Sequence, residues 1–348
     1  MKKRNVLNLI KYYSEHNDVG FRNEAYDIAR AFDNEGDYQL SEYIMALLSD
    51  ANTFVPQMSH DDAGFLRRIG FSKEALPLPE AIMKDVKGAI NAIGHNAGIN
   101  KYLFQGPPGT GKTETAKQIA NILNRDFFSV DSSSVIDSRL GQTAKNIMAL
   151  FREINGFAHP ERVVVLFDEI DTLALDRTNS NDVREMGRAT SAVLKSLDEL
   201  NENVVLIATT NLYPSFDKAL VRRFDSIIDF GRYSQEDLLD ISEIIMNGIL
   251  STFKFAGRDM RVFHKIMELM PAIPYPGELK NMLRTTVAFS DPGDEYDYLK
   301  SLYRSVALDN ADNIRWMKDR GFTVREMEKL TGRSKSSIAR ELKEQNYE

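Results

Sequence analysis

One loop constrains this chain more than any other part of its sequence, and it reads Gly106-Pro107-Pro108-Gly109-Thr110-Gly111-Lys112-Thr113. It follows a short apolar and aromatic run, Tyr102–Gln105, and precedes a helical pattern, so it joins a strand to a helix. Glycines let successive backbone N–H groups turn toward one anion, and the helix adds the positive end of its dipole. The pattern predicts a phosphate-binding loop in which Lys112 reaches the β- and γ-phosphates of a nucleotide and Thr113 binds Mg²⁺.

An acidic pair follows a continuous apolar strand. Val163–Phe167 ends in Asp168 and Glu169, and Asp168 lies 55 residues after Thr113. Buried parallel strands deliver such residues to the carboxyl edge of a sheet, where α/β proteins bind their ligands. We therefore expect Asp168 to hold Mg²⁺ and Glu169 to orient the attacking water, because phosphoryl transfer depends on positioning. The alternative for an acidic pair after a strand is a helix N-cap.

Two polar patterns lie farther along the chain. Asn211 follows the strand Val204–Thr210 and is suited to hold the water or the γ-phosphate, although an Asn before Leu-Tyr-Pro also suits a turn. Arg222 and Arg223 precede the last predicted strand, far in sequence from their own phosphate loop. This placement suggests arginine fingers that act on a neighbouring subunit's ATP; a solvated basic pair is the alternative.

The order of helical and strand patterns predicts an α/β fold with a parallel sheet and helices on both faces. The predicted strands are Tyr102–Gln105, Phe127–Val130, Val163–Phe167, Val204–Thr209 and Ile227–Phe230. After Gly231 only helical patterns remain, which indicates a smaller all-α subdomain. We divide the chain into a module of three amphipathic helices (1–50), a connector (51–78), an α/β domain (79–232), a helical region (233–290) and C-terminal helices (291–348).

These elements, in this order and spacing, resemble AAA+ ATPases over roughly residues 80–290, and within them the AAA group. The core and the helical N-terminal segment are also similar to bacterial AAA ATPases encoded beside subtilisin-like proteases. The resemblance implies ATP and Mg²⁺ as cofactors, a homo-oligomeric ring (a hexamer) whose sites are completed by Arg222 and Arg223 of the next subunit, and a helical lid after Gly231. In the lid, Pro276–Asn281 occupies the place of a sensor arginine, for which Lys280 is the nearest candidate.

The predicted pore loop departs from the relatives that thread polypeptides. Those relatives carry an aromatic–hydrophobic pair, whereas the matching stretch Asp137–Gly141 has Arg139 followed by Leu140. An aromatic ring grips an extended polypeptide, while an arginine offers a phosphate contact. Arg139 therefore favours a substrate other than a threaded protein, unless it pairs with acidic neighbours.

The segment Gly321–Leu342 reads as two short helices around a tight turn. Thr323 and Glu326 make a capping box, and Gly332 permits the turn. The segment resembles the helix-turn-helix of resolvases and insertion-sequence transposases, which implies DNA contact. The candidate DNA-binding residues on the outer face of the second helix are Lys335, Ser336, Ser337, Arg340 and Lys343. The alternative is a helical hairpin that packs on the lid.

Composition limits the remaining possibilities. The formal net charge of −7 argues against bulk electrostatic binding of nucleic acid, although residues 313–343 carry nine Lys and Arg against four Asp and Glu. The absence of cysteine excludes disulfides, cysteine–zinc sites and thiol catalysis, and the five histidines are scattered. No apolar run approaches the ~18 residues of a membrane span, and no export signal is visible, so we expect a cytoplasmic protein without membrane contact.

Three functions fit these patterns. The first is a ring-forming ATPase that remodels a macromolecule on DNA, anchored by the C-terminal helices. The second is an ATPase that remodels protein with a partner such as a protease, docked by residues 1–50. The third is an ATP-gated DNA-binding regulator with slow turnover, against which the intact Glu169 argues.

Overall fold

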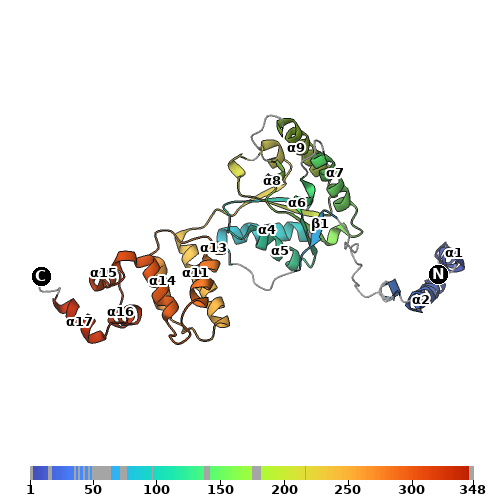
Figure 1. Ribbon diagram of the computed structural model, residues 1–348. Helices are drawn as coiled ribbons and strands as arrows, with labels where there is room; N and C mark the ends of the chain where they lie inside the picture. The colour runs from blue at the N-terminus through green and yellow to red at the C-terminus, as the bar shows by residue number, and fades with distance from the viewer. Residues whose placement is uncertain are drawn as a thin grey trace. The chain divides into compact units, whose positions relative to one another are not determined.

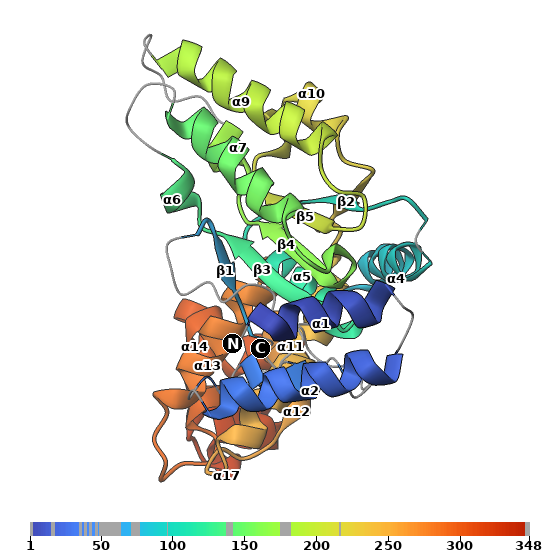
Figure 2. The ribbon, with the colours of Figure 1, turned by 90° about the vertical axis from the view of Figure 1, so that its right-hand side faces the viewer.

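The computed structural model describes residues 3–14, 18–34, 64–70, 77–95, 97–136, 142–174, 182–215 and 217–344, with the single positions 37, 40, 41, 44, 45 and 48. The chain forms two compact units, Met1–Asp61 and Asp62–Glu348, shown in two views in Figures 1 and 2. None of the helices in the described ranges has both the length and the apolar character needed to cross a bilayer.

The N-terminal unit contains two of the three predicted helices, α1 (Lys3–Ser14) and α2 (Asp18–Asn34). The Asn8 side chain donates to Glu24 at 3.0 Å and joins the two helices. The apolar face of α2 is buried, as Ile28 and Ala29 show. The third predicted helix falls largely outside the described residues.

The large unit is built on a six-stranded sheet in the order β1-β3-β4-β5-β2-β6. The strands are β1 (Leu66–Arg68), β2 (Lys101–Gln105), β3 (Asp126–Val130), β4 (Val163–Phe167), β5 (Val205–Thr210) and β6 (Ser226–Asp229). Strand β1 is antiparallel to β3, and the other neighbours are parallel. The five predicted strands are present within a residue or so at each end. Strand β1 differs from expectation, because it lies inside the stretch 51–78 that the sequence indicated as a connector.

Helices cover both faces of the sheet (Figure 1). Successive side chains of β4 point to opposite faces, so Val164 packs with α4 (Glu80–Gly94) and α5 (Lys112–Ile122), while Val165 packs with α7 (Gln142–Asn155) and α9 (Asp182–Asp198). Strand β4 is therefore buried on both sides and apolar throughout, as expected of a central parallel strand. The short elements of this domain are α6 (Ser132–Val135), η1 (Pro160–Arg162), α8 (Asp171–Ala174), η2 (Tyr213–Ser215) and α10 (Lys218–Val221).

The rest of the large unit is helical, as predicted. The helices are α11 (Gln235–Thr252), α12 (Met260–Glu268), α13 (Pro276–Ala288), α14 (Asp297–Ala307), η3 (Leu308–Asn310), α15 (Ile314–Asp319), α16 (Val324–Thr331) and α17 (Lys335–Glu344). One apolar core runs through them, from Ile241 of α11 to Met327 of α16 and Ile338 of α17. The boundary predicted at residues 290 and 291 thus falls inside a single packed core.

The predicted capping box and the turn at Gly332 are confirmed. Thr323 and Glu326 form a capping box at the start of α16, and Gly332 ends it in a left-handed conformation, φ 73°. Ser334 accepts a hydrogen bond from the Ser337 backbone at 3.3 Å and so caps α17. Lys265 of α12 donates to Glu326 at 2.7 Å, which ties α16 to α12 by charge as well as by apolar packing.

Candidate nucleotide site

The phosphate loop depends on backbone conformations that favour glycine. Gly106, Gly109 and Gly111 have φ values of 142°, 77° and 91°. A Cβ on Gly106 would lie 2.9 Å from the backbone of both Phe230 and Gly231, where no flexible side chain can yield. The glycines therefore set both the curvature of the loop and its close approach to the chain beyond β6.

The Lys112 ammonium lies against this loop, and the residue is only 7% exposed. Its Nζ donates to the Gly106 and Pro107 carbonyl oxygens at 2.7 and 2.8 Å. A third hydrogen bond runs to Asn211 Oδ1 at 2.8 Å. Burial lowers the pKa of Lys112, and the nearby carboxylates of Asp168 and Glu169 oppose that shift. Three hydrogen bonds to oxygen hold the cation where the sequence places phosphate groups.

Asp168 lies just beyond β4 and receives two hydroxyl groups. Thr113 Oγ1 is 3.0 and 3.1 Å from the two carboxylate oxygens of Asp168. Thr209 Oγ1, from β5, donates to Asp168 Oδ1 at 2.6 Å. Two sequence-distant elements, the start of α5 and the end of β4, thus bring together the hydroxyl and carboxylate oxygens that we expected to bind Mg²⁺.

Glu169 has an unusual backbone conformation for a non-glycine residue, φ 51°. Its backbone N–H donates to Thr209 Oγ1 at 2.9 Å, and its carbonyl accepts from the Thr172 backbone at 2.8 Å. Its Oε1 accepts from Asn211 Nδ2 at 3.3 Å. Asn211 therefore bridges Lys112 and Glu169, which places the predicted polar amide beside both groups.

These groups line one open pocket of about 310 Å³. The lining residues are Pro108, Gly109, Thr110, Gly111, Lys112, Thr113, Glu114, Lys117, Asp168, Glu169, Thr209, Asn211 and Gly277. Among the described residues, no cluster of three or more His, Cys, Asp or Glu side chains could hold a metal ion. The hard oxygen atoms of Thr113 and Asp168 do fit Mg²⁺, which in nucleotide sites is bound by few protein oxygens together with phosphates.

The helical region after β6 reaches the phosphate loop through two contacts that the sequence did not predict. The Gly277 backbone N–H donates to the Gly109 carbonyl at 2.8 Å, and the Tyr233 hydroxyl donates to the Thr110 carbonyl at 2.8 Å. Burial raises the pKa of the Tyr233 hydroxyl. Lys280, the predicted sensor residue, is half-buried and does not line the pocket.

The two predicted arginine fingers differ. Arg223 donates to both carboxylate oxygens of Asp198 at 3.2 and 3.3 Å and to the Ala219 carbonyl at 3.2 Å. Arg222 is exposed, and its side chain has no hydrogen bond or ion pair within the described part of the chain. Neither arginine lines the pocket of its own chain. Arg222 is therefore the one whose guanidinium is available to another molecule.

The predicted DNA-binding face of α17 carries mixed charge. Lys335, Ser336, Arg340 and Lys343 are exposed, and Ser337 is half-buried. Lys335 pairs with Glu328 at 3.3 Å, and Arg340 pairs with Glu344 at 3.6 Å. The predicted pore-loop residues Arg139 and Leu140 lie outside the described residues.

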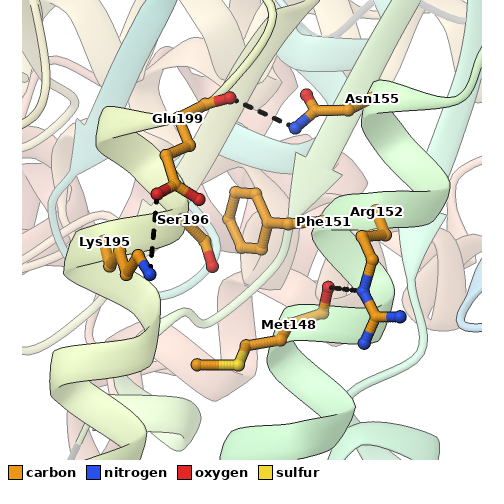
Figure 3. A pocket seen from close by; sticks show the side chains of 7 residues that line it. All are labelled: Met148, Phe151, Arg152, Asn155, Lys195, Ser196 and Glu199. Carbon is orange, nitrogen blue, oxygen red and sulfur yellow. Dashed lines mark hydrogen bonds and ion pairs between the residues drawn. The ribbon is translucent and has the colours of Figure 1, made fainter.

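A second hollow, of about 190 Å³, lies between α7 and α9 (Figure 3). Its polar groups bond to one another: Lys195 pairs with Glu199 at 3.7 Å, and Asn155 donates to the Glu199 carbonyl at 3.2 Å. None of the predicted site residues lines it. This hollow is thus separate from the cluster around Lys112.

Comparisons with known proteins agree with the geometry. Residues 102–232 match the family model described as "ATPase family associated with various cellular activities (AAA)". An uncharacterized AAA family ATPase of Sinorhizobium fredii is 41% identical over 133 residues, which are 38% of this chain and 39% of that protein. A putative 26S proteasome regulatory subunit homologue of Methanocaldococcus jannaschii is 28% identical over 292 residues, 83% of this chain and 71% of that protein.

A solved structure shares the fold. In the HORMA:CdnC:Trip13 complex of E. coli MS115-1, one chain aligns with a TM-score of 0.54 and 17% identity, covering 68% of this chain and 94% of that chain. The aligned part of the chain spans only 39% of the length of the Sinorhizobium relative. Domains of the AAA family hydrolyse ATP with Mg²⁺, in agreement with the cofactors predicted from the loop and the acidic pair.

Proposed function

We propose that the chain, whose residues 102–232 match the AAA family model, assembles into a ring and uses ATP hydrolysis to remodel a protein substrate. The observation that carries the catalytic part is the convergence of Lys112, Asp168, Glu169 and Asn211 on one pocket. These residues come from three separate segments of the chain, and their hydrogen bonds orient them toward the phosphate loop. Positioned charge of this kind is what phosphoryl transfer requires.

Each residue then has a distinct task. The glycine-rich loop and Lys112 bind the phosphates through backbone N–H groups and an ammonium. Thr113 and Asp168 hold Mg²⁺, which neutralises charge that develops on the phosphates. Glu169 orients and polarises the attacking water, and Asn211 fixes Glu169 relative to Lys112. Water activation by a positioned carboxylate contributes about 10²- to 10⁴-fold in typical enzymes.

Ring assembly is supported by the contrast between the two arginines. Arg222 is exposed and unpaired within the described ranges, whereas Arg223 is held by Asp198. A guanidinium that cannot serve its own pocket is suited to complete the pocket of a neighbour. The hexameric state, the sensor role of Lys280 and the cytoplasmic location remain predictions from the sequence.

A protein substrate is favoured over DNA by the charges of the C-terminal helices. Lys335 and Arg340 of α17 are paired with carboxylates, which reduces the positive field of this face. Helix α16 is also tied to α12 through Lys265 and Glu326. The named M. jannaschii relative is a putative proteasome regulatory subunit homologue. In the N-terminal unit, α1 leaves Leu7, Ile10 and Tyr13 exposed, which supports docking of a protein partner such as a protease.

DNA is the second candidate, because one observation favours it. Lys335, Arg340 and Lys343 are exposed together on α17, within a segment of net charge +5. A helix with such a face can contact phosphates and base edges. In this case the chain is either a DNA-associated remodelling ATPase or an ATP-gated DNA-binding regulator.

One experiment separates the two substrates. Steady-state ATP turnover of the full chain is measured alone, with unfolded casein and with duplex DNA, while sedimentation in ATP reports the oligomeric state. A protein-remodelling ring gives an ATP-dependent oligomer whose turnover rises with casein and not with DNA. Stimulation by DNA that disappears in Arg340→Ala/Lys343→Ala would overturn the protein proposal. A monomer in saturating ATP would contradict the ring.

A further inference from the structure

Thr209 is a buried polar residue that neither the motifs nor the proposed mechanism uses. It is the fifth residue of β5 and is 1% exposed, among apolar neighbours of the sheet core. A buried hydroxyl is costly unless its hydrogen-bonding capacity is satisfied. Here it is satisfied in both directions, because Oγ1 donates to Asp168 Oδ1 at 2.6 Å and accepts from the Glu169 backbone at 2.9 Å.

We infer that Thr209 is a positioning residue for ATP hydrolysis, whose hydroxyl fixes the direction of both Asp168 and Glu169. The inference rests on the roles proposed above for those two carboxylates. Thr209 touches neither the water nor the phosphates in this role; it acts through its two neighbours.

The position of Thr209 explains how one hydroxyl reaches both residues. Regular pairing between β4 and β5 ends at Phe167 opposite Ala208. Thr209 is the next residue of β5, and its side chain takes the Glu169 N–H where the ladder stops. Its carbonyl accepts the Ile170 N–H at 3.0 Å. Two successive backbone N–H groups after β4 are thus fixed by a single residue of β5.

This anchoring matters because Glu169 has a strained backbone. A non-glycine residue at φ 51° is strained, and this conformation persists only where surrounding bonds hold it. The hydrogen bond that the Glu169 N–H donates to Thr209 and the one that the Glu169 carbonyl accepts from Thr172 hold the peptide units on either side of the Glu169 α-carbon. The resulting turn directs the Glu169 carboxylate toward Asn211, 3.3 Å away.

Thr209 also holds the Asp168 carboxylate in place. The Asp168 carboxylate is bonded to the hydroxyls of Thr113 and Thr209. We assign the Thr113 hydroxyl to Mg²⁺. The Thr209 hydroxyl has no such role and serves to orient the Asp168 carboxylate. Groups that orient a metal ligand in this way are worth about 10- to 100-fold in metal affinity or activity.

The test compares two substitutions at Thr209 with a control on the same strand. Thr209→Val keeps the buried, β-branched shape and removes the hydroxyl, whereas Thr209→Ser keeps the hydroxyl. Thr210→Val is the matched control, because Thr210 is equally buried and its hydroxyl, among the residues that the structure describes, accepts from the Leu212 backbone at 3.0 Å and contacts neither carboxylate. Readouts are kcat, the KM for ATP, the Mg²⁺ concentration for half-maximal nucleotide binding, and nucleotide affinity in EDTA.

We expect Thr209→Val to lower kcat about tenfold or more and to raise the half-saturating Mg²⁺ concentration about tenfold, with KM and Mg²⁺-free affinity changed by less than about threefold. Thr209→Ser should recover both quantities to within about threefold of wild type. A merely structural role would instead weaken Mg²⁺-free binding and affect Thr210→Val equally. Three outcomes would each overturn the inference. They are equal effects of the two valine variants, wild-type kcat and Mg²⁺ dependence in Thr209→Val, and failure of Thr209→Ser to recover either quantity.

Glu169→Gln in the same series separates this inference from the proposed function. If Glu169→Gln keeps wild-type turnover, the catalytic assignment itself fails. If Glu169→Gln abolishes turnover while Thr209→Val behaves as wild type, the assignment stands and only the role of Thr209 is wrong.

Discussion

Gly106→Ala tests how far the site depends on the close approach of backbone to backbone. The substitution forces an alanine to φ 142° and places its Cβ 2.9 Å from the backbone of Phe230 and Gly231. The conformational strain costs about 1–2 kcal/mol, and the overpacking adds about 1–3 kcal/mol because the contacted atoms cannot rotate away. We therefore expect the free energy of unfolding to fall by about 2–5 kcal/mol.

Gly98→Ala is the matched control for this prediction. Gly98 also has a positive φ, 73°, but a Cβ there meets nothing within 4 Å. Its cost should be the strain alone, about 1–2 kcal/mol. Urea denaturation gives the two stabilities, and nucleotide affinity with steady-state turnover reports the site. Gly106→Ala should lose at least about tenfold in turnover, while Gly98→Ala keeps wild-type turnover. Equal stability and equal turnover of the two variants would refute the reasoning.

Three further predictions follow from the contacts. Asn211→Ala removes the bridge between the ammonium and the catalytic carboxylate, so kcat should fall about 100-fold in steady-state assays with little change in KM; an unchanged kcat would contradict the bridge. Arg222→Ala should leave the denaturation midpoint unchanged and lower turnover about 1,000-fold. Mixing Arg222→Ala subunits with Glu169→Gln subunits should restore turnover at the interfaces that combine an intact Arg222 with an intact Glu169. Arg223→Ala should lower the free energy of unfolding by up to about 1 kcal/mol, because its ion pair with Asp198 is lost. Burial alone favours protonated Glu326, but the hydrogen bonds that Glu326 accepts outweigh burial and lower its pKa below the ordinary 4.5. The stabilisation that ionised Glu326 gives to the folded chain is therefore complete above pH 4.5 and is lost as the pH falls through the lowered pKa. Glu326→Gln should therefore cost about 2 kcal/mol in urea denaturation at pH 7 and progressively less below pH 4.5; a constant difference would contradict the linkage.

Sequence patterns predicted most of the ATPase fold because its strands are apolar and end in recognisable polar residues. Val163–Phe167 is an example, since five buried apolar residues followed by Asp168 and Glu169 leave few other structures. Strand β1 was not predicted, because Leu66–Arg68 is short and buries only its first residue, so the sequence shows no periodicity there. The edge of a sheet needs few apolar side chains and leaves a weak pattern.

The details of the site were harder to predict than its motifs. Thr209 looks like an ordinary strand threonine, and only the register of β4 against β5 brings its hydroxyl to Asp168 and Glu169. The difference between Arg222 and Arg223 depends on Asp198, which is distant in sequence and is aligned by the end of α9. Thr209 follows the apolar run Val204–Ala208 and stands two residues before Asn211, and this position is the sequence signal that could have pointed to it.

The most direct test of the account is ATP turnover by the full chain and by Glu169→Gln, with nucleotide affinity measured on both. Glu169 lies 3.3 Å from Asn211 and outside the hydrogen bonds of Lys112, so its substitution leaves phosphate binding in place. The account predicts Mg²⁺-dependent turnover that falls at least about 100-fold in Glu169→Gln, with ATP affinity within about threefold of wild type. Turnover in Glu169→Gln close to that of the wild-type chain would contradict the assignment of this pocket as the site of hydrolysis.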